Sequence, residues 1–227
     1  MNDQKLVSVV IPVYNREKYL AQAIQSVLNQ KGNISRNIII IDDGSTDKSA
    51  EIAKSFGDCI TYIYQKQSGI SAARNAGVMA SQGELIAFLD SDDLWMENKL
   101  LLQAQALDSD PSLDVIFGHI QQFISPELPD EAKAKLVCDA TITQGYHAST
   151  MLIKKQSFLK VGFFDLGLRA GEFIDWYNRA KNLGLKSCML QDLLAMRRLH
   201  DTNYGILERK VYSDYFKMLK KAMERKK

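Results

Sequence analysis

The stretch Gly83–Trp95, GELIAFLDSDDLW, decides how the rest of this chain is interpreted. Its apolar run, residues 85–89, ends abruptly in acids, which is typical of a buried strand in a parallel sheet. Asp90, Asp92 and Asp93 then crowd three carboxylates at the carboxyl end of that strand, where open α/β sheets bind ligands. A divalent cation that bridges to the phosphates of a substrate would relieve their repulsion. A solvated acidic turn before the next helix is the alternative.

Working outward, the same pattern recurs on both sides of this stretch. Apolar runs at 6–11 and 38–41 predict two more buried strands, the first followed by Tyr14 and Asn15 and the second by Asp42 and Asp43. The first half therefore alternates strands and helices, which favours an α/β fold with a mostly parallel sheet. The expected strands are 6–11, 38–41, 60–64 and 85–89, and the expected helices are 19–28, 49–56, 68–77 and 97–107.

The second half is less regular. We expect strands at 115–123, 146–153, 185–190 and 193–199, helices at 155–161 and 172–180, and an exposed loop at 125–134. Small residues in 68–77 predict a helix that lies close against its neighbour. Arg74 is the one cation of that helix, and either a phosphate or a surface ion pair would suit its guanidinium.

Bulk composition indicates an ordinary soluble globular protein, with 46% apolar and 25% charged residues among 227. A net charge of +2 is too small to indicate nucleic acid as a partner. Three scattered cysteines argue against a disulfide framework and fit a reducing cytoplasm. We find neither a signal segment nor an apolar run of the roughly 20 residues that cross a bilayer, so any membrane contact is expected to be peripheral, at the inner face.

Four motifs in order and in register resemble the family 2 glycosyltransferases of the GT-A fold. They are VSVVIPVYNR at 7–16, IIIIDDGSTD at 38–47, SGISAARNAG at 68–77 and GELIAFLDSDD at 83–93, with a weaker likeness through 172–179 and His200. The resemblance implies a single GT-A-like domain over 1–205. Its nucleotide-sugar-binding half would be 1–110, and its smaller acceptor and catalytic half would be 111–205.

The resemblance also implies roles for individual residues. The nucleotide diphosphate sugar donor would contact residues on both sides of the expected sheet edge, namely Pro12, Tyr14, Asn15, Asp43, Arg74, Asp90 and Ser91. Asp92 and Asp90 match the DxD motif that holds Mn²⁺ or Mg²⁺, and His200 would support the metal from the far side. A cation there would stabilise the charge that grows on the leaving diphosphate.

The position of the general base departs from the family pattern. Relatives carry Glu-Asp followed by Arg six residues after the Asp, whereas here Glu172 and Arg179 match but Phe173 replaces the acid. Phenylalanine cannot accept a proton, so we expect Glu172 to be the base, with Asp175 as the second choice. The alternative for Glu172 is an acid that only favours the start of its helix.

Several other residues keep two interpretations. His119 and His147 lie beside apolar strands and are expected to pack or to face water rather than to bind a ligand. Trp95 and Trp176 suit either a sugar-binding face or the core, and for Trp95 we favour the sugar. The basic amphipathic segment 206–227 would dock on its own domain or on a second copy in an oligomer, or would lie on an anionic membrane.

The expected function is inverting transfer of a sugar from a nucleotide diphosphate to a hydroxyl of a saccharide, a lipid-linked molecule or another acceptor. A catalytically impaired nucleotide-sugar-binding partner or regulatory subunit is the alternative. A nucleotidyltransferase is disfavoured, because no Gly-rich loop with a lysine follows the first strand.

Overall fold

A computed structural model describes residues 5–168 and 170–203 of the chain. The expected terminal helix at 206–227 lies outside the described residues. The strands are β1 (Val7–Val13), β2 (Arg36–Asp42), β3 (Ile60–Tyr64), β4 (Leu85–Phe88), β5 (Leu94–Trp95), β6 (Val115–Ile124), β7 (Thr143–Gly145), β8 (Leu152–Lys154) and β9 (Ser187–Leu199). The α-helices are α1 (Leu20–Leu28), α2 (Ser49–Lys54), α3 (Ile70–Ala80), α4 (Lys99–Ser109), α5 (Asp130–Lys133), α6 (Lys155–Val161) and α7 (Glu172–Asn182), and short 3₁₀ turns span Gly57–Cys59 and Ala148–Thr150.

The nine strands of the described residues form one sheet, ordered β3-β2-β1-β4-β8-β6-β9-β5 with β7 paired to β6. The first four pair in parallel, as the alternating pattern predicted. β8 then joins β4 in the antiparallel sense, and the second half of the sheet is mixed. The chain winds from β1 towards β3 on one side and places β4 on the other, so the order reverses between β1 and β4.

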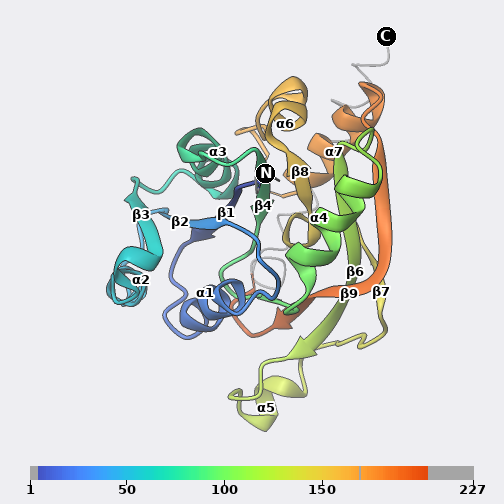
Figure 1. The fold of residues 1–227 in the computed structure, drawn as a ribbon. Coiled ribbons are helices and arrows are strands. Elements are labelled where there is room, and N and C mark those ends of the chain that lie inside the picture. Colours follow the sequence, from blue (N-terminus) through green and yellow to red (C-terminus); the bar gives the residue numbers. More distant parts are fainter. Residues whose placement is uncertain (1–4, 169, 204–227) are drawn as a thin grey trace.

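Helices cover both faces of the sheet (Figure 1). One apolar cluster joins alternate residues of β1 to α1, α2 and α4, and the other joins β2 and β4 to α3, α6 and α7. The close approach expected for residues 68–77 is real, because a Cβ on Gly77 would lie 2.2 Å from Cγ1 of Val10. The result is an α/β fold of three layers with a curled sheet.

Several expected elements differ from the structure. β1 continues through Pro12 to Val13 because β4 pairs only as far as Val10, so the missing N–H of Pro12 breaks no ladder there. β9 is a single strand where two were expected, and its register shifts opposite Phe117–His119 take up the irregular residues between them.

The expected strand 146–153 is mostly a turn. Side chains capture its carbonyl groups: the indole N–H of Trp95 donates to Ser149 O, and the amide of Gln103 donates to Thr150 O. Trp95 is thereby only 4% exposed, so its expected contact with a sugar is wrong, and Trp176 is likewise fully buried. The expected loop at 125–134 contains the short helix α5.

In the part of the chain that the structure describes, no helix combines the length and the apolar character that a bilayer crossing requires.

Candidate functional site

The candidate site lies at the carboxyl ends of β1, β2 and β4, next to the point where the strand order reverses. Loops after β1 and β2 are tied together, since the Thr46 N–H donates to Asn15 Oδ1 at 2.8 Å and the Asn15 N–H donates to Ser45 Oγ. Asn15 has a φ of 51°, a left-handed conformation that asparagine tolerates better than most residues. Tyr14 stands beside it with 40% of its surface exposed, whereas Pro12 is buried in β1.

Asp43 shapes the floor of this region. Its carboxylate accepts hydrogen bonds from Gln65 Nε2 at 2.7 Å and from the N–H groups of Ser68 and Gly69 at 2.8 Å each. These bonds hold the turn that leads into α3, which carries Arg74. Asp43 is only 5% exposed, and its contacts within the protein position that turn.

Arg74 joins two of the expected site residues. Its Nη2 donates to Asp90 Oδ1 at 2.7 Å and its Nη1 donates to Glu172 Oε1 at 2.5 Å, across 98 residues of sequence. Burial lowers the pKa of this arginine, but the charges of Asp90 and Glu172 outweigh burial and raise it. Burial conversely raises the pKa of Asp90, and Arg74 outweighs it and holds that pKa below its ordinary value. The guanidinium and the Asp90 carboxylate are therefore both charged.

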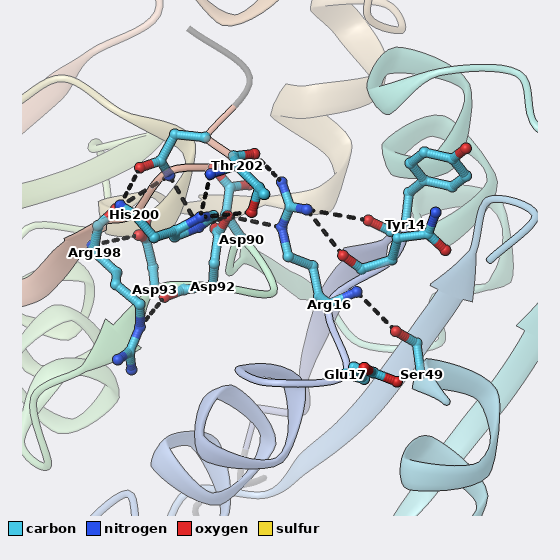
Figure 2. A network of polar contacts seen from close by, with 12 residues as sticks. Tyr14, Arg16, Glu17, Ser49, Asp90, Asp92, Asp93, Arg198, His200 and Thr202 are labelled. Carbon is cyan, nitrogen blue, oxygen red and sulfur yellow. Dashed lines mark hydrogen bonds and ion pairs between the residues drawn. The ribbon is translucent and has the colours of Figure 1, made fainter. Parts of the chain in front are cut away.

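Asp92 faces the loop after β1 (Figure 2). Its Oδ2 accepts a hydrogen bond from Arg16 Nε at 3.0 Å and lies 3.1 Å from His200 Nε2. The Thr202 N–H donates to Nδ1 of His200, and Nε2 faces both Asp92 and the amide nitrogen of Asn203, each at 3.1 Å. His200 is fully buried against Asp92 in this arrangement, and its expected support of the metal stays a prediction.

Asp93 and His147 complete the group that sequence reasoning left incomplete. Among the described residues, one group of acids and histidines has ligand atoms close enough together to hold a metal ion. It consists of Asp90, Asp93 and His147. His147 was expected to pack or to face water, but its Nε2 lies 3.8 Å from Asp90 Oδ2. No local pattern marks it, because the turn at Ala148–Thr150 brings it to β4 only in the folded chain.

These two residues suit support better than ligation. Asp93 accepts hydrogen bonds from Ser149 Oγ and the Arg198 N–H, and burial and the charges of Asp92 and Asp90 raise its pKa well above the ordinary value. The Ser149 N–H donates to His147 Nδ1, which leaves the proton on Nε2. Burial lowers the pKa of His147, although the charge of Asp90 raises it.

Asp90 and Asp92 fit a hard divalent cation. Hydrogen bonds within the described residues occupy Oδ1 of Asp90 and Oδ2 of Asp92, and the other oxygen of each carboxylate accepts none. Their side chains remain 24% and 15% exposed, so an ion can reach them. Two carboxylate oxygens are what Mg²⁺ or Mn²⁺ takes from a protein when phosphate oxygens complete the shell. Ser91 between them is 6% exposed.

The residues around the expected base divide between the site and the core. Glu172 keeps 12% side-chain exposure beside Arg74. Asp175 is 1% exposed and accepts from Arg179 Nε at 3.0 Å, a position that suits holding α7 to its surroundings rather than meeting an acceptor. Phe173 is 7% exposed and meets Phe117 edge-on.

Comparison with known proteins identifies the class. The family model described as glycosyl transferase family 2 matches residues 8–164, and the chain belongs to that family. An uncharacterized glycosyltransferase of Rickettsia typhi is 34% identical over 210 residues, which are 86% of this chain and 64% of that protein. This chain therefore spans less than two thirds of that relative.

Two solved structures share the GT-A fold with this chain. Staphylococcus aureus TarS 1–349 in complex with UDP-GlcNAc superposes with a TM-score of 0.72 at 18% identity, covering 93% of this chain and 65% of that one. The mannosyltransferase PcManGT of Pyrobaculum calidifontis, in complex with GDP-Man and Mn²⁺, gives a TM-score of 0.74 at 16% identity, covering 98% and 65%.

Proposed function

We propose that this chain binds a nucleotide diphosphate sugar at the edge formed by β1, β2 and β4 and transfers the sugar, with inversion, to a hydroxyl acceptor. One observation carries the proposal: Asp90 and Asp92 follow β4 at the reversal point of the sheet, near the exposed Tyr14, and each has one carboxylate oxygen that accepts no hydrogen bond from the described residues. The nucleotide sugars bound to the two structural relatives support the choice of donor.

The proposed donor contacts rest on the family resemblance, and Tyr14 is the exposed member of the set. Tyr14 offers a ring face to the base, Asn15 and Asp43 line the nucleoside end together with Pro12, and Arg74 and Ser91 lie towards the sugar. A divalent cation held by Asp90 and Asp92 would stabilise negative charge on the leaving diphosphate. His200 and Arg16 set the orientation of Asp92.

Glu172 is the proposed general base. Glu172 forms an ion pair with Arg74, and Arg74 also pairs with Asp90. A single guanidinium therefore bridges the proposed base and the donor side of the site. Arg74 donates to Oε1 of Glu172, so the other carboxylate oxygen, Oε2, would accept the proton from an acceptor. A base on the side opposite the leaving group makes the transfer a single displacement with inversion.

The second candidate is a nucleotide-sugar-binding partner with impaired catalysis. Phe173 favours it, because this residue occupies the usual acidic position and packs against Phe117 inside the domain. Such a protein would bind the donor without turnover. We also propose that the acceptor is a saccharide, a lipid-linked molecule or another hydroxyl compound, and that the chain works in the cytoplasm or at the inner membrane face, alone or as an oligomer.

Calorimetry and turnover together test the proposal. UDP and GDP are titrated with and without Mn²⁺ into the wild-type chain and Asp92→Ala, and we expect metal-dependent affinity that the variant loses. Unchanged affinity in the variant refutes the metal site. Glu172→Gln should keep nucleotide affinity and lose sugar transfer or donor hydrolysis; tight binding by the wild type without turnover over a broad acceptor screen supports the partner instead.

A further inference from the structure

A hollow of about 380 Å³ lies beside the candidate donor site, in the size range of small-molecule sites. Tyr146 forms one wall, and the outward face of α7 forms the other. The residues of that face are Phe173, Ile174, Tyr177, Asn178 and Lys181. Tyr146 and Ile174 are 46% and 43% exposed, so this hollow exposes apolar surface that the domain core does not cover.

Ring contacts hold the hollow in shape. Tyr146 and Tyr177 stack at 5.4 Å and 26°, and Phe173 lies nearly parallel to Tyr177 at 6.3 Å. The fully buried Phe117 supports both tyrosines from beneath, at 5.4 and 5.1 Å. Offset and edge-on pairs of this kind are favourable, so the aromatic surface is preformed rather than assembled by a ligand.

Two residues of the lining are chain neighbours of residues in the proposed reaction centre. Tyr146 precedes His147, which lies against Asp90. Phe173 follows Glu172, the proposed base, which Arg74 joins to Asp90. The hollow therefore adjoins the part of α7 that carries the proposed base.

The lining matches the chemistry of a sugar ring. A pyranose has an apolar C–H face and a rim of hydroxyl groups, and here the half-exposed ring of Tyr146 is combined with the amide of Asn178 and the ammonium of Lys181, whose Nζ lies 5.0 Å from the centre of the Tyr177 ring. An acyl chain would satisfy neither polar group. The mixture of apolar walls and few polar groups is typical of sites that fix a ligand's orientation.

We propose that the hollow between Tyr146 and α7 binds a pyranose ring of a saccharide acceptor. The acceptor role rests on the proposed function, whereas binding of the sugar ring does not. Phe173, which replaces the usual acid, would then form part of the wall of the acceptor site.

Saturation-transfer NMR with three probes tests the inference: methyl β-D-glucopyranoside, methyl N-acetyl-β-D-glucosaminide and methyl α-D-mannopyranoside. We expect at least one of them to receive saturation at its ring protons. Tyr146→Ala should weaken that binding about three- to tenfold, the scale for loss of one aromatic partner, and Tyr146→Phe should retain it. Tyr64→Ala is the matched control, because Tyr64 is 63% exposed on the distant strand β3.

No saturation from any of the three probes, or equal saturation in Tyr146→Ala and Tyr64→Ala, overturns the inference. UDP and GDP with Mn²⁺ are titrated into the same samples. If the wild-type chain binds a sugar probe but neither UDP nor GDP, the proposed function is refuted and the sugar site is not. If it binds a nucleotide but no sugar probe, the acceptor site is refuted and the proposed function is not.

Discussion

Arg16→Gln tests whether the protein itself holds Asp92 in place of a cation. Arg16 Nε lies 3.0 Å from Asp92 Oδ2, and the two side chains are 18% and 15% exposed. The pair therefore falls between exposed ion pairs, worth about 0.2–1 kcal/mol, and charge-assisted hydrogen bonds, worth about 1.5–3 kcal/mol. We therefore assign the Arg16–Asp92 pair an interaction free energy of about 1–2 kcal/mol.

The guanidinium neutralises Asp92, so a cation must overcome that interaction to bind there. Removing it should tighten Mn²⁺ binding in the absence of nucleotide by roughly 5- to 30-fold, at about 1.4 kcal/mol per tenfold. Glutamine keeps much of the side-chain length and can still donate to a nearby carbonyl. The amplitude of the free Mn²⁺ signal in electron paramagnetic resonance gives the dissociation constant directly.

Lys18→Gln is the control, since Lys18 is exposed in the same loop and its replacement changes the net charge equally. If Arg16→Gln binds Mn²⁺ no more tightly than Lys18→Gln does, Arg16 does not compete with the cation and the reasoning fails.

Three further predictions concern packing and charge. Gly77→Ala should destabilise the domain by about 1–3 kcal/mol in urea unfolding because its Cβ would meet Val10, and Val10→Ala should recover part of that loss; additive losses contradict the clash. Burial lowers the pKa of Lys99 well below 10.5, so the unfolded chain binds the extra proton and stability should rise with pH between the lowered value and 10.5. Lys99→Met should remove that slope, and an unchanged slope in denaturation at pH 7 and 9.5 contradicts this. Phe173→Asp should lower the free energy of unfolding by at least about 3 kcal/mol, and a melting temperature equal to that of the wild type contradicts the packed position of Phe173. Increased sugar transfer by this variant, normalised to folded protein, would reveal that the native chain lacks a base at this position.

Much of the first half of the fold could be predicted because its information is local. Continuous apolar runs mark strands buried on both faces, and the acids that end them mark the edge of the sheet where the candidate site lies. β3 and α6 have the predicted bounds, and β4 agrees to one residue. The second half was predicted less well, since its turn at Ala148–Thr150 depends on side chains from Trp95 and Gln103.

The candidate site divides in the same way. The sequence by itself determined the family, the parallel first half of the sheet and the three carboxylates after β4, because each depends on residues adjacent in the chain. Only the tertiary structure decided their partners: Arg74 spans to Glu172, Arg16 reaches Asp92, and His147 arrives beside Asp90. These pairings join residues 57 to 98 positions apart, and pairings at such distances follow from the packing of whole elements, which no local pattern encodes.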